Sequence, residues 1–152
     1  MGTNHRQDLT DVGSPSIDRR RIGLLALALL VSWASMLFHN LSELPITLTD
    51  LANMGPLAFD VVLLVACLWR PRSRVLWAVI LAWGLLNMVV GGIVTVLPLP
   101  ILPFVPEQTV EHYAVHLVYT IGQLPLVLVA TMVLYREQGT RANGGRDGRA
   151  DD

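Results

Sequence analysis

EHYAVHLVYTIGQ, residues 111–123, opens the last apolar segment of this 152-residue chain. His112, His116, Tyr119 and Gln123 follow one another at intervals of four, three and four residues. On an α-helix this spacing places the four side chains on one stripe about 60° wide. A helix that enters lipid cannot expose such a stripe without a large cost, so we expect it to face other helices or water.

The rest of the chain groups its apolar residues into long segments of the same kind. Hydrophobic residues make up 53% of the sequence, and four segments, at about 22–42, 50–69, 75–97 and 110–135, are each long enough to cross a bilayer as a helix. We therefore predict an all-α integral membrane protein, a four-transmembrane-helix bundle, with its transmembrane domain at 21–136. The polar stretches 1–20 and 137–152 are predicted to be disordered arms.

The first apolar segment has a second interpretation. Arg19–Arg21 followed by an apolar run is also typical of a signal peptide, with Ser32-Trp33-Ala34 as the cleavage site. The apolar run continues past that site to Phe38, which favours an uncleaved helix.

Positive charge is confined to three parts of the chain. The sequence has no lysine, and its arginines lie before residue 22, in the turn at 70–74, or after residue 135. The other two connections carry Glu43, Asp50, Glu107 and Glu111 and no arginine. The positive-inside rule then predicts a multi-pass protein of the cell membrane with both termini cytoplasmic and the two acidic connections outside.

Polar residues inside the apolar segments are graded by depth. Each segment has one polar residue near the middle of the membrane: Ser32, Asp60, Asn87 and Gln123. A second group lies toward the outer side: His39, Glu43, His112, His116 and Tyr119. The cytoplasmic halves are almost wholly apolar. We therefore predict a polar cavity that opens outward and is closed toward the cytoplasm, with Asp60, Asn87 and Gln123 as its floor and Asp60 as the proton-accepting member.

The outer group contains two pairs of potential ligands. His39 with Glu43, and His112 with His116, are each four residues apart, so both members of a pair share one helix face. Two such pairs on different helices can converge like the inward-facing ligands of helix-bundle metal sites. Imidazole and carboxylate suit Zn²⁺, copper or iron, so these four residues are candidate ligands of a divalent metal or of haem b. Hydrogen-bonded histidines without a metal, and histidines that transfer protons, are the alternatives.

Two short patterns resemble known proteins. A four-helix bundle with histidines on two helices, here His39 on one and His112 and His116 on the other, resembles the b-type membrane cytochromes in architecture, which implies haem b. The pentapeptide from His39 to Glu43 resembles the acid–base pair of membrane sterol isomerases, which implies acid–base chemistry on a lipidic substrate. Neither resemblance covers enough of the chain to assign a family, so no residue roles are carried over.

The connections add two further expectations. Pro98, Pro100, Pro103 and Pro106 exclude a regular helix between the third and fourth segments, so this stretch is expected to be extended, in the interface or over the mouth of the bundle. Thr47 and Asp50 have the spacing of a capping box at the start of the second helix.

These patterns support three classes of function. The leading hypothesis is a membrane protein that binds a cation or small ligand from the outer side, coupled to proton movement. The second is a membrane-embedded enzyme that acts on a lipidic substrate, with His39, Glu43 or Asp60 as general acid and base. The third is a structural subunit, as a homo-oligomer or beside a partner membrane protein. Nucleic-acid binding is not expected, because the topology explains the arginines.

Overall fold

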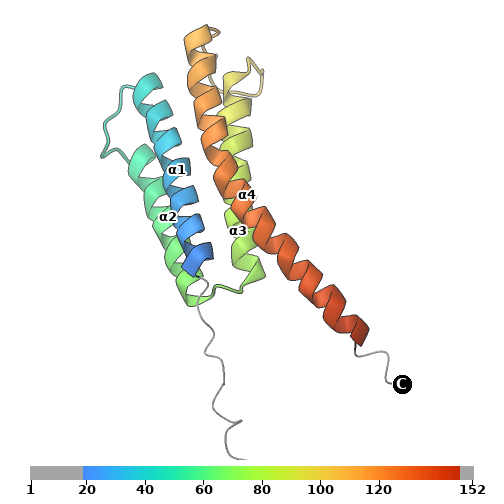
Figure 1. Ribbon diagram of the computed structural model, residues 1–152. Helices are drawn as coiled ribbons and strands as arrows, with labels where there is room; N and C mark the ends of the chain where they lie inside the picture. The colour runs from blue at the N-terminus through green and yellow to red at the C-terminus, as the bar shows by residue number, and fades with distance from the viewer. Residues whose placement is uncertain (1–18, 148–152) are drawn as a thin grey trace, which may run out of the picture.

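The computed structural model describes residues 19–147, with side chains up to residue 136. Within these residues the chain forms helices and turns and no strand (Figure 1). The elements are α1 (Arg19–Glu43), α2 (Leu51–Trp69), α3 (Arg74–Leu85) and α4 (Val110–Asp147), and α3 runs on directly into the π-helix η1 (Leu86–Ile93) and the 3-10 helix η2 (Val94–Val96). Of the stretches predicted to be disordered, 1–20 and 137–152, residues 1–18 and 148–152 lie outside the described residues, and the remainder is helical.

The four predicted apolar segments are confirmed as helices. In the described part of the chain, four helical stretches are long and apolar enough to cross a membrane: Arg19–Glu43, Leu51–Trp69, Arg74–Val96 and Val110–Arg136. Two ends differ from the prediction. Helix α1 begins at Arg19, and α4 continues to Asp147 although the sequence predicted an end near Tyr135. Each further residue of an existing helix adds a hydrogen bond without a new nucleus, and residues 136–138 are Arg, Glu and Gln, which are good helix formers.

Helices α1 and α4 pack against each other at the centre of the bundle. Helix α2 packs mainly on α1, while α3 and η1 pack on α4, and the contact between α2 and α3 is smaller (Figure 1). The apolar core fills the half of the bundle that adjoins the Arg70–Arg74 turn, with these buried members: Leu25, Ala28, Leu29, Leu63, Cys67, Trp77, Ile80, Leu126, Ala130 and Val133. The polar side chains of the cavity lie in the opposite half of the bundle.

Two glycines allow α4 to approach its neighbours closely. A Cβ atom added at Gly122 would overlap the side chain of Ser35 on α1. A Cβ atom added at Gly92 of η1 would overlap the Thr120 hydroxyl and lie 3.3 Å from the Thr120 Cα atom. Because glycine has only a hydrogen atom in place of a side chain, these two positions allow α1 and η1 to lie close to α4.

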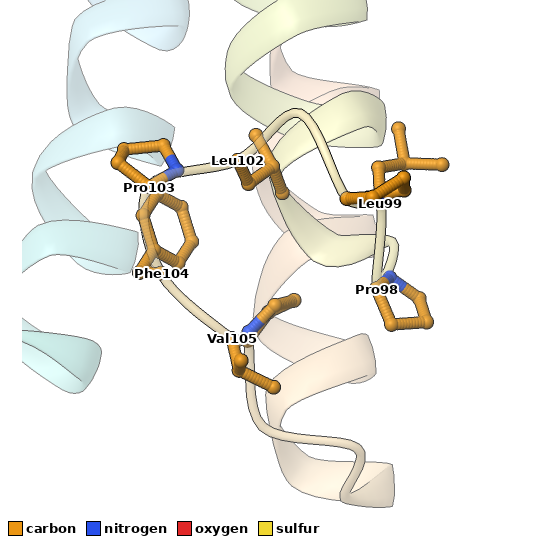
Figure 2. A pocket seen from close by; sticks show the side chains of 8 residues that line it. Pro98, Leu99, Leu102, Pro103, Phe104 and Val105 are labelled. Atoms are coloured by element: carbon orange, nitrogen blue, oxygen red, sulfur yellow. The ribbon is translucent and has the colours of Figure 1, made fainter.

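The connection between η2 and α4 is irregular, as its prolines predict. It surrounds a hollow of about 350 Å³ lined by its own side chains, all of them proline or large apolar residues (Figure 2). Phe104, Pro106 and Glu107 from this connection also line a larger cavity at the end of the helices. The connection therefore forms part of a cavity wall.

The turn before α2 holds an acid whose titration can be predicted. Asp50 is the N-cap residue of α2, and its carboxylate accepts hydrogen bonds from the backbone N–H of Thr47 and, at 2.8 Å, from the Thr47 hydroxyl. These two bonds, the backbone one first, lower the pKa of Asp50 below its ordinary value.

We expect Asp50 to stabilise the fold at any pH above its unfolded pKa and to lose this contribution as the pH falls through its lower folded pKa. Carboxyl-carbon NMR titration should place its midpoint below that of an ordinary aspartate. Thr47→Ala removes the hydroxyl bond and keeps the backbone bond, so it should raise the Asp50 pKa part of the way back. An ordinary midpoint in the unmodified protein would contradict the described turn.

Candidate functional site

The polar stripe of α4 faces α1. Gln123 is fully buried and uses its whole amide group at this contact. Ser32 Oγ donates to Gln123 Oε1 at 2.5 Å, and Gln123 Nε2 donates to the Ser32 carbonyl at 3.1 Å and to Ser35 Oγ at 3.2 Å. Gln123 and Ser32 therefore join the two central helices, and neither lines the cavity.

Nearer the end of the helices, the histidines of α4 meet the polar residues of α1 in two hydrogen-bonded pairs. His112 Nδ1 lies 2.7 Å from Glu43 Oε2. His39 Nε2 lies 3.0 Å from His116 Nε2. The ring of His116 lies between the other two imidazoles, with centroids 4.4 Å from His39 and 4.5 Å from His112 and edge-to-face geometry in both contacts.

The structure thus brings the four candidate metal ligands together as two bonded pairs. Each pair uses nitrogen or oxygen atoms that would otherwise bind a metal. Among the side chains that the structure describes, no group of three or more His, Cys, Asp or Glu residues could hold a metal ion as arranged. The metal or haem site predicted from the sequence would require the His39–His116 pair to separate, because all four of its ring nitrogens are hydrogen-bonded.

The histidine pair is anchored at both ends by backbone carbonyls. At one end, His116 Nδ1 lies 3.2 Å from the Gly92 carbonyl of η1. At the other end, His39 Nδ1 lies 3.0 Å from Asn40 Oδ1, and Asn40 Nδ2 donates to Asn53 Oδ1 of α2 at 2.9 Å. Asn53 Nδ2 in turn donates to the Thr47 carbonyl at 2.8 Å.

These side chains form one wall of a cavity of about 490 Å³. It lies between α1, η1, α4 and the proline-rich connection. Its lining includes two carboxylates, three imidazoles, two aromatic rings and no arginine: Met36, His39, Asn40, Glu43, Leu44, Gly91, Thr95, Phe104, Pro106, Glu107, His112, His116 and Tyr119.

One ring nitrogen of a residue that lines the cavity is unsatisfied. His112 is 9% exposed, and its Nε2 atom is the buried side-chain nitrogen or oxygen, among the described residues, that has no hydrogen-bond partner. A buried polar atom without a partner costs about 1–3 kcal/mol. With Nδ1 donating to Glu43, a neutral His112 presents a lone pair at Nε2. That atom can accept a hydrogen bond from a ligand or take up a proton as a general base.

The predicted floor of the cavity is not assembled. Asp60 is 4% exposed, and its bond comes from Trp83 Nε1 at 2.9 Å. Asn87 donates to the Trp83 carbonyl at 2.8 Å and accepts from the Tyr119 hydroxyl at 3.0 Å. Neither residue lines the cavity. The reason is helix order: Asp60 lies on α2, which packs against α1 and α3, so an equal predicted depth did not bring it into a hydrogen bond with Gln123 of α4.

Two residues of the site were missed in the sequence. Asn40 and Asn53 are 9% and 0% exposed and connect His39 to the Thr47 carbonyl. Their signal was present: an amide side chain in an apolar helix needs a hydrogen-bond partner, and Asn40 adjoins His39. No site role was predicted for Phe104 or Glu107, because an irregular connection has no periodicity to orient its side chains.

Fold and site together define a helical bundle typical of multi-pass membrane proteins, with an apolar core at one end and a histidine-lined cavity at the other. The chain matches no protein-family model, no curated protein and no solved structure. The site is therefore interpreted from its own geometry.

Proposed function

We propose that this chain is a multi-pass membrane protein that binds a small organic cation from the outer side, in the cavity between α1, η1, α4 and the proline-rich connection. The observation that carries the proposal is the unpartnered Nε2 atom of His112, held in the cavity wall by the Glu43 carboxylate. A ligand with an N–H group would satisfy this atom.

The charge and size of the cavity support a cation. Glu43 and Glu107 contribute carboxylates, and no arginine lines the cavity. Phe104 and Tyr119 offer aromatic rings, whose faces attract cations. The volume of about 490 Å³ lies within the range of small-molecule sites, about 300–1,000 Å³. A primary alkylammonium ion combines the required charge with N–H donors.

The distribution of arginine supports the orientation. Arg19–Arg21 begin α1 and Arg70–Arg74 connect α2 to α3, and both lie at the end of the bundle opposite the cavity (Figure 1). By the positive-inside rule this end, with both termini, is cytoplasmic and the cavity opens outward.

Titration calorimetry of the purified protein in detergent, with methylammonium and with tetramethylammonium, tests the ligand class. Methylammonium should bind more tightly, because tetramethylammonium has the same charge and no N–H group. His112→Phe keeps a ring of similar size and removes Nε2. A hydrogen bond from a charged group contributes about 1.5–3 kcal/mol, so methylammonium affinity should fall roughly ten- to 150-fold.

Tyr113→Phe is the matched control, because Tyr113 lies on the same turn of α4, is exposed and does not line the cavity. It should leave affinity unchanged. No binding of methylammonium, or equal affinity in His112→Phe, would contradict the proposal. A further titration uses Zn²⁺: one Zn²⁺ bound per chain, with no ammonium bound, would replace the proposed cation by the metal that the sequence suggested.

A further inference from the structure

Two backbone carbonyls determine which ring nitrogens of the His39–His116 pair carry a proton. The Thr47 and Gly92 carbonyls stand at the two ends of one hydrogen-bonded chain that runs through Asn53, Asn40 and the two imidazoles. A carbonyl oxygen can only accept a hydrogen bond. Each end therefore fixes the direction of the bonds that lead from it.

The Thr47 end fixes the proton on His39 Nδ1. The Thr47 carbonyl must receive Asn53 Nδ2, which leaves Asn53 Oδ1 as the acceptor for Asn40 Nδ2. Asn40 then presents Oδ1 to His39, and an amide oxygen cannot donate, so His39 Nδ1 carries a proton. Exchanging the oxygen and nitrogen positions of the two asparagine amides does not offer an alternative arrangement. It would set Asn53 Oδ1 against the Thr47 carbonyl, two acceptors 2.8 Å apart.

The Gly92 end fixes the proton on His116 Nδ1, which donates to that carbonyl at 3.2 Å. The two remaining nitrogens, both Nε2, face each other at 3.0 Å, and such a contact requires one donor and one acceptor. The four ring nitrogens therefore carry three protons, whereas two neutral imidazoles carry two. We infer that the His39–His116 pair is a proton-binding site that holds one extra proton between its Nε2 atoms and carries a single positive charge.

The surroundings of the pair compensate for this charge. On α1 and α4 the nearby titratable groups are Glu43, His112 and Tyr119, and Glu107 of the proline-rich connection lines the same cavity. Helix α2 contributes the Asn53 amide, and η1 contributes the Gly92 carbonyl. The Glu43 carboxylate, bonded to His112, is the negative charge in the wall beside the pair. Charge compensation of this kind is what a buried positive group requires.

The extra proton also holds the bundle together at this end. Its loss leaves two lone pairs facing each other, and a second extra proton would set two N–H groups against each other. Either change breaks the His39–His116 bond, which joins α1 to α4 beside the cavity together with the Glu43–His112 bond. This property belongs to the protein without a ligand, so it goes beyond cation binding and can hold even where that proposal fails.

NMR of protein with ¹⁵N-labelled histidine, in detergent at neutral pH and without ligand, counts the protons directly. Long-range proton–nitrogen correlations distinguish protonated from unprotonated ring nitrogens, and single His→Gln variants assign the rings. We expect both Nδ1 atoms to be protonated and one low-field proton to be shared by the two Nε2 atoms. Two or four protonated nitrogens in place of three would overturn the inference, whatever the protein binds.

Asn40→Leu removes the acceptor that requires a proton on His39 Nδ1. The number of protons on the four ring nitrogens of the His39–His116 pair should therefore fall from three to two at neutral pH. Asn87→Leu makes the same change outside the hydrogen-bonded chain and should keep a count of three. A count of three in Asn40→Leu would show that the asparagine chain does not set the charge. The measurement on the unmodified protein stands independently if Asn40→Leu fails to fold.

Discussion

Gly122→Ala should lower the free energy of unfolding by about 1–3 kcal/mol, the usual effect of overpacking a well-packed contact. The new methyl group would overlap the Ser35 side chain, including its Cβ atom, which cannot rotate away. The two central helices would have to move apart, which would also lengthen the bonds from Gln123 to Ser32 and Ser35. Unfolding in a series of detergent mixtures, followed by circular dichroism, measures the loss.

Gly23→Ala is the matched control, because it is the same substitution in a helix with nothing within 4 Å of the added atom. It should be neutral or stabilise by up to about 1 kcal/mol, as alanine is the better helix former. If both variants unfold alike, α1 and α4 do not make the close contact at Gly122 that the structure shows.

Trp83→Phe should destabilise the bundle by about 1–3 kcal/mol. The Trp83 indole is the hydrogen-bond donor to the buried Asp60 side chain, and its ring also packs edge-to-face on Phe59 with centroids 4.7 Å apart. Phenylalanine can keep the ring contact but leaves the Asp60 carboxyl group without that donor in an apolar surrounding. The same unfolding measurement in detergent gives the loss.

The double variant Asp60→Leu with Trp83→Phe removes both partners and should recover much of that loss. Trp33→Phe is the control. It deletes an indole bond to the Asn53 carbonyl, at 3.0 Å, and should cost only about 0.5–1.5 kcal/mol, since the acceptor left behind is a backbone carbonyl and not a buried carboxyl group. A double variant less stable than Trp83→Phe would mean that Asp60 does more than accept this bond.

The helices of this protein could be predicted from the sequence because length and apolar composition decide them. Four runs of apolar residues became four helices, and the stripe that begins at His112 predicted correctly that α4 has a polar side. The grouping of the arginines, and the position of each polar residue along its segment, also predicted that one end of the bundle is apolar and the other polar. These are properties of single segments, and they need no knowledge of which helix neighbours which.

What could not be predicted depends on helix order and on atomic distances. Asp60 was predicted at the depth of Gln123, but Asp60 is bonded to Trp83 of α3, whereas Gln123 is bonded to Ser32 and Ser35 of α1. The spacing of His39, Glu43, His112 and His116 is compatible with metal ligands and with hydrogen-bonded pairs. Only the separations of 2.7 and 3.0 Å show that the donors and acceptors face each other.

The apolar core beneath the cavity has a consequence for exchange. Its ten buried members, from Leu25 to Val133, include no side-chain oxygen or nitrogen except the indole N–H of Trp77, a donor that is already bonded to the Pro71 carbonyl. For the membrane protein proposed above, a cation in the cavity would meet no further polar side chain in this layer, so we expect it to leave by the side from which it entered. The proposed site would then equilibrate with one compartment alone, as a receptor site does and a channel does not.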